Sequence, residues 1–208
     1  MRSGGVQPTK QGNLITEYKD FLSEYQLQQI WGHHICQAKW QFGQKSNNDT
    51  VYPMWFQHYY NCVMGGQAGY TDDAHPFAKE VGDRFLDIIG ITEPYVLIRN
   101  MIAGNTFGQD GDIHKDWVNP GESITGVLYL NRRWEDNWGG ETIVYREDSR
   151  NCEISKFEAG KLVIFDSERP HIGHGPQRAC GELRCIIAVQ AVTKVAWDRM
   201  VDKKTNKS

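Results

Sequence analysis

The feature of this sequence that most constrains its fold is a succession of short strand-like segments after Pro94. Gly, Asn, Asp or Pro stands in most of the gaps between them. Many short strands at close spacing are typical of an antiparallel sandwich or barrel. We therefore predict a mainly β fold, with strands over residues 95–102, 113–117, 124–130, 141–146, 153–157, 161–165 and 183–192.

The N-terminal part of the chain carries helix signals instead. Ser23 and Gln26 fit a capping box, and apolar residues follow at helical spacing. Pro76 opens a second segment, whose apolar residues share one face of a helix through Ile89, and Gly90 is the expected stop. We predict two helices packed on the outside of the β structure.

The stretch between these helices is rich in aromatic residues. Residues 39–42 are predicted to form a short strand, and residues 43–73 are predicted to be irregular. Two interpretations remain open for the aromatic side chains of this stretch. They form either a wall that faces the substrate or a layer packed on the core.

The chain shows no internal repeat, linker or low-complexity insert, and its 208 residues are enough for a domain with its own core. We predict a single domain over residues 14–200, in which residues 95–192 carry the functional motifs. Residues 1–13 are rich in Gly, Gln, Pro and Lys and are predicted to be disordered. Residues 201–208 are predicted to form a polar tail.

Composition and charge exclude several classes of partner. The net charge is −3 and no basic block occurs before the lysines of the C-terminal end, so we expect no binding to nucleic acid or to a membrane. No apolar run reaches membrane-spanning length, and the first residues lack the apolar stretch of a signal peptide. The five cysteines lack paired spacing, which favours reduced thiols and a cytoplasmic location. These features do not indicate an oligomeric state.

His114 and Asp116 form the first part of a candidate metal site. They lie two residues apart in a predicted strand, where side chains at that spacing leave the same face. His171 follows a later predicted strand and adds a second imidazole. Two histidines and one carboxylate, with other coordination positions open, are the ligand set of non-haem Fe(II) sites for oxygen chemistry. Structural zinc would instead require four ligands, usually including cysteine.

The second imidazole has two candidates, and one arginine stands out nearby. His171 is preferred over His174 because it directly follows Pro170 at the end of a strand, whereas His174 lies in a glycine-rich turn. Arg184 lies inside a predicted apolar strand. An arginine in such a place is expected to meet an anion.

Taken in order, these motifs resemble those of the Fe(II)/2-oxoglutarate-dependent dioxygenases of the prolyl 4-hydroxylase-like group. The similarity runs from Arg99 to Val192. Within this range it includes His114, Asp116 and the segments 126–142 and 160–184. The spacing between His171 and Arg184 is similar to that of a microbial and phage-type branch. The resemblance implies a double-stranded β-helix, or jelly roll, with flanking N-terminal α-helices.

The resemblance also implies roles for the site residues. Fe(II) would bind to His114, Asp116 and His171 as metal ligands. Arg184 would hold the distal carboxylate of the cosubstrate 2-oxoglutarate, because its planar fork matches a carboxylate, and Tyr129 would donate its hydroxyl to it. The implied reaction uses O2 to hydroxylate an unactivated C–H bond and releases succinate and CO2, with ascorbate as a candidate reductant.

The substrate is left between two classes, a prolyl peptide and a small molecule such as a free amino acid. The group resemblance favours the peptide, and a short chain without a peptide-binding repeat favours the small molecule. Desaturation or cyclisation would use the same residues.

Two hypotheses of a different kind compete with the oxygenase. One is a non-catalytic metal- or ligand-binding double-stranded β-helix protein, and the second is a jelly-roll metalloenzyme of another class, such as a zinc enzyme. The complete ligand set and Arg184 favour the oxygenase, because a binding module would be expected to lack one of these four residues.

Overall fold

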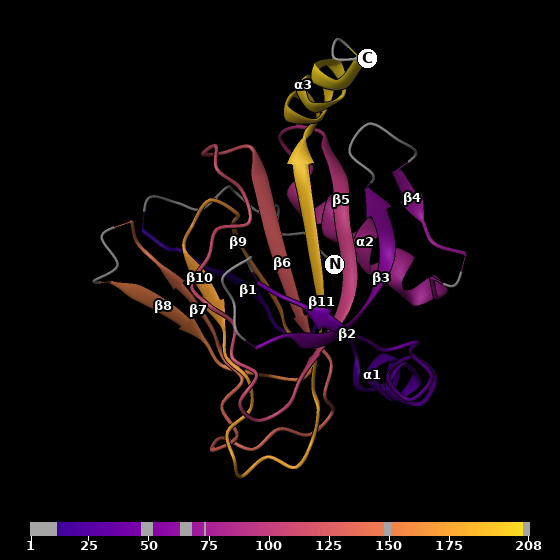
Figure 1. Cartoon of the computed structure of the whole chain (residues 1–208), viewed down its shortest axis with the longest axis vertical. Coiled ribbons are helices and arrows are strands. Elements are labelled where there is room, and N and C mark those ends of the chain that lie inside the picture. The colour runs from indigo at the N-terminus through magenta and orange to yellow at the C-terminus, as the bar shows by residue number, and fades with distance from the viewer. Residues whose placement is uncertain (1–11, 47–51, 63–67, 73, 148–150, 206–208) are drawn as a thin grey trace, which may run out of the picture.

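The computed structural model describes residues 12–46, 52–62, 68–72, 74–147 and 151–205. An antiparallel eight-stranded sheet dominates it, in the order β1-β9-β6-β11-β5-β3-β2, with β4 paired to β3 (Figure 1). Its strands are β1 (Thr16–Tyr18), β2 (Gln41–Gln44), β3 (Met54–Cys62), β4 (Ala68–Tyr70), β5 (Tyr95–Asn105), β6 (Ser123–Tyr129), β9 (Leu162–Asp166) and β11 (Arg184–Thr193).

A smaller sheet of three strands, in the order β10-β7-β8, lies across from one part of the large sheet (Figure 1). Its strands are β7 (Thr142–Tyr145), β8 (Cys152–Ser155) and β10 (His171–Gly173). After β8 the chain alternates between the sheets, because β9 and β11 belong to the large sheet and β10 to the small one. The predicted mainly β fold, a jelly roll with flanking N-terminal helices, is confirmed.

Helices α1 (Glu24–Ile30) and α2 (Pro76–Ile89) pack against the large sheet, and α1 continues into a short π-helical segment, η1 (Trp31–Ile35). The side chain of Ser23 accepts a hydrogen bond from the Gln26 backbone N–H, and the Gln26 side chain accepts one from the Ser23 backbone N–H. Both predicted helices are therefore present, and the capping box begins the first.

A third helix, α3 (Lys194–Thr205), directly follows β11 and was missed by the sequence analysis. The Thr193 hydroxyl accepts a hydrogen bond from the Ala196 N–H, which provides the cap at its start. The predicted polar tail, residues 201–208, therefore begins inside a helix. Residues 1–11 of the predicted disordered stretch lie outside the described residues, whereas Leu14, the first residue after that stretch, is buried.

Two cores lie on opposite faces of the large sheet, and β6 contributes to both. Leu128 belongs to the core between the sheet and the helices, which also contains Phe85 of α2. Val127 and Tyr129 belong to the core between the two sheets, with Phe165 of β9. Side chains that alternate along a strand leave opposite faces, so β6 is covered on both sides and is apolar throughout its second half.

Two predictions about local structure were wrong. Residues 43–73 are not irregular, since they contain β3 and β4 and the end of β2. Residues 113–117 form no strand, and their one ladder contact is an isolated bridge between His114 and His171. Both errors concern pairing with distant parts of the chain, because β3 pairs with β5 and the bridge joins two residues that four strands, β6 to β9, separate along the chain.

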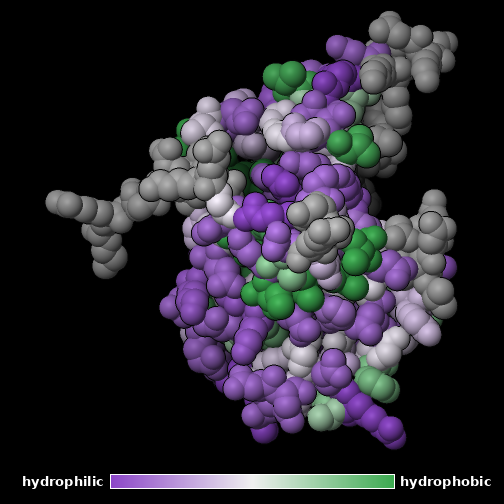
Figure 2. Space-filling model, turned by 90° about the vertical axis from the view of Figure 1, so that its left-hand side faces the viewer, coloured by the Kyte–Doolittle hydropathy of each residue, from purple (hydrophilic) through white to green (hydrophobic). Residues whose placement is uncertain are grey.

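Figure 2 shows the side of the molecule on which the small sheet lies. Hydrophilic side chains cover most of this face, and hydrophobic ones gather in small groups near its middle. Within the part of the chain that the structure describes, no helix combines the length and apolar character needed to cross a bilayer. The four cysteines with described side chains are free thiols, as predicted: Cys36, Cys152, Cys180 and Cys185.

Gly126 allows close contact between β6 and α2, and we expect Gly126→Ala to destabilise the protein. A Cβ at this position would lie 2.7 Å from a methyl group of Val189 and 2.8 Å from the ring of Phe85. Overpacking of this kind costs about 1–3 kcal/mol. Urea unfolding would measure the loss, with Gly69→Ala as the control, because a Cβ there meets no described atom within 4 Å. Equal stabilities of the two variants would contradict the tight packing.

Candidate metal centre and adjoining cavity

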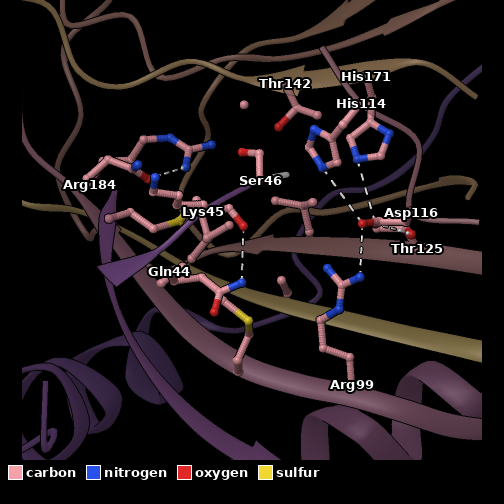
Figure 3. Close-up of a pocket in the computed structure, with 18 residues that line it drawn as sticks. Gln44, Lys45, Ser46, Arg99, His114, Asp116, Thr125, Thr142, His171 and Arg184 are labelled. Atoms are coloured by element: carbon pink, nitrogen blue, oxygen red, sulfur yellow. Dashed lines mark hydrogen bonds and ion pairs between the residues drawn. The ribbon is translucent and has the colours of Figure 1, made fainter. Parts of the chain in front are cut away.

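Three potential metal ligands meet between the two sheets. His114, Asp116 and His171 offer ligand atoms that all lie within 4.8 Å of one another. The His114 Nε2 lies 3.7 Å from Asp116 Oδ1, and the His171 Nε2 lies 3.6 Å from Asp116 Oδ2 (Figure 3). The arrangement joins two imidazoles and one carboxylate, the set predicted from the sequence.

Backbone pairing, rather than a regular strand, brings the ligands together. The N–H of His114 donates to the His171 carbonyl at 3.0 Å, and the N–H of His171 donates back at 2.9 Å. The Asp116 N–H donates to the Ser167 carbonyl at 2.9 Å. The segment 114–116 is therefore held along the start of β10, and His114 and Asp116 still point to one side.

Each imidazole is oriented by a backbone carbonyl. The Nδ1 atom of His114 lies 2.8 Å from the Asp112 carbonyl oxygen, and that of His171 lies 2.9 Å from the Arg169 carbonyl oxygen. A carbonyl only accepts, so Nδ1 carries the proton and donates in both rings. The Nε2 atoms then point toward Asp116, the orientation that metal coordination requires.

The environment keeps His171 neutral and Asp116 charged. Burial lowers the pKa of His171 to about 4, against the opposing effect of Asp116. Burial alone would raise the pKa of Asp116, but Arg99 and the two imidazoles outweigh it and hold that pKa below its usual range. Asp116 Oδ1 accepts from Arg99 Nη2 at 2.9 Å, and Oδ2 accepts from the Thr125 hydroxyl at 2.8 Å. Neutral imidazoles and an ionised carboxylate are the ligand forms that a metal binds.

A cavity of about 290 Å³ adjoins the three ligands and extends to Arg184. Strands of both sheets line it, together with the chain that follows β2. Most of its polar side chains are labelled in Figure 3. The lining residues are Gln44, Lys45, Ser46, Met54, Arg99, Met101, Ala103, Asn105, His114, Asp116, Thr125, Val127, Thr142, His171, Gly173, Arg184, Ile186 and Ala188.

Arg184 is a buried cation with an incomplete set of partners. Its side chain lies at the start of β11 and the residue is 2% exposed. Nε donates to the Gly140 carbonyl at 2.9 Å and Nη1 to the Asn105 side-chain oxygen at 3.4 Å. Nη2 is buried without a hydrogen-bond partner among the described residues. Burial lowers the pKa of Arg184, so this position favours an anion beside it.

Tyr129 lies next to Arg184 but does not line the cavity. The guanidinium carbon of Arg184 is 5.7 Å from the centre of the Tyr129 ring. The Tyr129 hydroxyl is within hydrogen-bond distance of the Thr142 hydroxyl, at 2.9 Å, and of the Ser155 carbonyl, at 3.1 Å. Thr142 itself lines the cavity. Direct donation from Tyr129 to a cosubstrate therefore stays a prediction.

His174 lies apart from the three ligands. Its Nδ1 is 3.3 Å from a carboxylate oxygen of Asp110, and its side chain is 32% exposed. Sequence reasoning missed Arg99, Thr125 and Thr142, because each contacts a partner in another strand or loop that only the fold brings beside it. The sequence signal that could have found these three residues is a polar side chain on the strand face that also carries site residues. This signal is weak.

The stretch 43–73 contributes to the cavity, but not through its described aromatic residues. Its lining residues are Gln44, Lys45, Ser46 and Met54, of which none is aromatic. Tyr59 is instead 2% exposed in the core between the large sheet and the helices, and Tyr60 and Tyr70 pack against that core. The interpretation as a packing layer is thus the better one for these tyrosines.

The fold and the site together define a class of protein: a jelly roll that presents two histidines and a carboxylate beside a buried arginine. Residues 99–189 match the family model described as the 2OG-Fe(II) oxygenase superfamily, and this stretch contains all four residues. Residues 99–189 thus carry a 2OG-Fe(II) oxygenase domain. The predicted class, a 2-oxoglutarate- and iron-dependent dioxygenase that uses Fe(II), 2-oxoglutarate and O2, is confirmed.

Solved structures share this fold at low sequence identity. A 2OG-Fe(II) oxygenase family protein from Burkholderia pseudomallei aligns with a TM-score of 0.67 and 13% identity, over 86% of this chain and 85% of that one. A Trichoplax adhaerens prolyl hydroxylase in complex with a hypoxia inducible factor peptide aligns with a TM-score of 0.66 and 16% identity, over 92% of this chain and 87% of that one. A Pseudomonas putida prolyl-4-hydroxylase aligns with a TM-score of 0.63 and 18% identity, over 88% of this chain and 94% of that one. A comparison with curated protein sequences finds no match.

Proposed function

We propose that this protein hydroxylates an unactivated C–H bond of a small molecule or of a prolyl or amino-acid substrate, with release of succinate and CO2. In this proposal His114, Asp116 and His171 bind Fe(II), and Arg184 binds the distal carboxylate of 2-oxoglutarate. The observation that carries it is the presence of the three ligands and an incompletely paired buried arginine in one cavity.

The residues present fit this pair of cofactors. The two Nε2 atoms and the Asp116 carboxylate face one another at 3.6–3.7 Å, as ligands of one metal would. The buried Arg184 Nη2 lacks a partner among the described residues, and a buried unsatisfied donor is costly. A carboxylate beside it would accept that hydrogen bond and neutralise the guanidinium.

The protein's own contribution is positioning and exclusion of water. Bound Fe(II) and 2-oxoglutarate would supply the oxidising chemistry with O2. The carbonyls of Asp112 and Arg169 hold the imidazoles in one orientation, while Arg99 and Thr125 hold the Asp116 carboxylate. The apolar cavity walls from Met101, Val127, Ile186 and Ala188 limit the access of water to the reacting atoms.

Tyr129 serves this site through Thr142. The Thr142 hydroxyl can receive the hydrogen of Tyr129 and turn its own hydrogen into the cavity near Arg184. Thr142 would then be the hydroxyl that contacts the cosubstrate, with Tyr129 as the positioning residue behind it. This assignment keeps a hydroxyl as the hydrogen-bond donor to the cosubstrate, but it gives that role to Thr142 instead of Tyr129.

The substrate class stays open between a peptide and a small molecule. The Trichoplax adhaerens structure shows that a protein of this fold accepts a peptide. A cavity of about 290 Å³, which must also hold 2-oxoglutarate, suits a small substrate or a single inserted side chain. Mass spectrometry of the product separates hydroxylation, which adds one oxygen atom, from desaturation or cyclisation, which removes two hydrogen atoms.

An anaerobic ultraviolet–visible titration of the Fe(II)-loaded protein with 2-oxoglutarate tests the proposal. We expect a weak charge-transfer band in the visible region that saturates with cosubstrate. Removal of iron with a chelator should abolish the band, and added Fe(II) should restore it. Absence of the band, with zinc in place of iron, would instead indicate a metalloprotein of another class.

A further inference from the structure

Arg99 is a second cation at the metal centre, on the opposite side from Arg184. Along β5 it lies six residues before Asn105, the residue paired with Arg184, which corresponds to roughly 20 Å of strand. Figure 3 shows Arg99 beneath Asp116, with Arg184 at the other end of the cavity. The two arginines therefore serve different ends of one cavity.

Only part of the Arg99 guanidinium is used by the protein. Nη2 donates to Asp116 Oδ1 at 2.9 Å and to the Gln190 side-chain oxygen at 2.5 Å. A guanidinium has five N–H groups, and no described residue accepts a hydrogen bond from Nε or Nη1 of Arg99. The side chain is 31% exposed and lines the cavity, so it offers free donors close to a metal ligand.

The charges of the cavity lining leave an excess of positive charge. Arg99, Arg184 and Lys45 are cationic, and Asp116 is the one carboxylate among the described lining residues. Both histidines act as neutral ligands in the proposed site. Fe(II) and doubly charged 2-oxoglutarate cancel each other, so their binding leaves this excess in place. An anionic group of the substrate would balance it.

We propose that the substrate carries a carboxylate and that Arg99 binds it. This inference rests on the proposed function and specifies its substrate class as a small carboxylic acid. The remaining N–H groups of Arg99, on Nε and Nη1, can each donate a hydrogen bond to a carboxylate, and such charge-assisted bonds are stronger than neutral ones. Lys45, which lines the cavity on the side of β2, adds a second positive charge along the approach. The C–H bond to be oxidised then lies within a few bonds of the carboxylate, because Arg99 also contacts the metal ligand Asp116.

Binding of matched acids and amides tests this substrate class. The protein is loaded with Mn(II) and 2-oxoglutarate under nitrogen, and the relaxation of ligand protons is measured by NMR. The probes are free L-amino acids, each compared with its C-terminal amide, and a prolyl peptide with a free or an amidated C-terminus. We expect at least one free acid to bind about tenfold or more tightly than its amide, since hydrogen bonds to charged groups are the stronger ones. Aerobic succinate release should rank the probes in the same order.

Variants separate a role in substrate binding from a role in holding Asp116. Arg99→Gln should lose the preference for acids, and Arg99→Lys should keep a reduced preference. Lys79→Gln removes the same charge from an exposed pair with Asp83, neither of which lines the cavity, and should change nothing. The visible band formed with Fe(II) and 2-oxoglutarate is measured in each variant, so that loss of the metal site is recognised.

The outcomes distinguish this inference from the proposed function. A wild-type protein that forms the band but binds acids and amides equally, or binds no acid, overturns the carboxylate inference and leaves the oxygenase proposal standing. Retention of the full preference by Arg99→Gln overturns the role of Arg99. Absence of the band in the wild-type protein removes both proposals.

Discussion

Replacement of His171 by alanine is expected to abolish iron-dependent turnover, whereas His174→Ala should retain most of it. The His171 Nε2 lies 3.6 Å from an Asp116 oxygen, while His174 is paired with Asp110 outside the ligand cluster. Loss of one of three protein ligands should also remove most of the metal affinity. Succinate release in the presence of 2-oxoglutarate and iron, together with bound iron measured after desalting, checks both expectations.

Thermal unfolding provides a second readout that does not depend on catalysis. A ligand present at about 100 times its Kd stabilises a folded protein by about 2.7 kcal/mol. Mn(II) should therefore raise the melting temperature of the wild-type protein and of His174→Ala, but not that of His171→Ala. The opposite pattern, with His174→Ala inactive and unaffected by Mn(II), would assign the third ligand to His174.

Features encoded over a few neighbouring residues were predictable from the sequence. The capping box of Ser23 and Gln26 locates the start of α1, and Pro76 and Gly90 locate the ends of α2. The order of the ligand motif and Arg184 pointed to one cavity, which the structure shows. The helix signals lie within a few neighbouring residues. Arg184 stood out because an arginine is rare inside an apolar strand unless it binds an anion.

Features that depend on pairing between distant segments were not predictable in the same way. β3 has a mixed aromatic and polar sequence, and its pairing with β5 makes it a strand. The segment around His114 is held by the backbone of His171 and Ser167 instead of by a sheet neighbour of its own. The contact of Arg99 with Asp116 requires the register of β5 against β11, which no local pattern contains.

The electrostatics of the metal centre connect these two kinds of information. A motif identifies Asp116 as a ligand, but it does not say why the carboxylate stays ionised at a site where only 6% of its side chain is exposed. The structure supplies the reason, because Arg99 and Thr125 donate to its two oxygens. The same contact leaves part of Arg99 free, and a structural partner of one ligand thereby becomes a candidate for substrate recognition.

Arg184→Met is expected to abolish most of the affinity for 2-oxoglutarate without destabilising the fold. Removing one partner of a buried charge pair costs about 2–5 kcal/mol, which is roughly a 30-fold to several-thousand-fold loss of affinity. Methionine fills much of the space beside the rings of Tyr129 and Phe157 and removes a buried, incompletely paired cation. Replacement of a buried charge by an apolar side chain is often neutral or stabilising. The unfolding midpoint of the cofactor-free variant should therefore match or exceed that of the wild type.

Anaerobic titration of the visible band measures the affinity, and urea unfolding of the cofactor-free proteins measures the stability. Arg178→Ala, which alters an exposed arginine, is the control and should change neither quantity. Arg184→Lys should bind 2-oxoglutarate with intermediate affinity, because lysine keeps the charge but lacks the planar pair of donors. If Arg184→Met binds 2-oxoglutarate as tightly as the wild type, Arg184 does not hold the carboxylate. A large loss of stability in that variant would show that the guanidinium is held by Gly140 and Asn105 for the fold rather than for a cosubstrate.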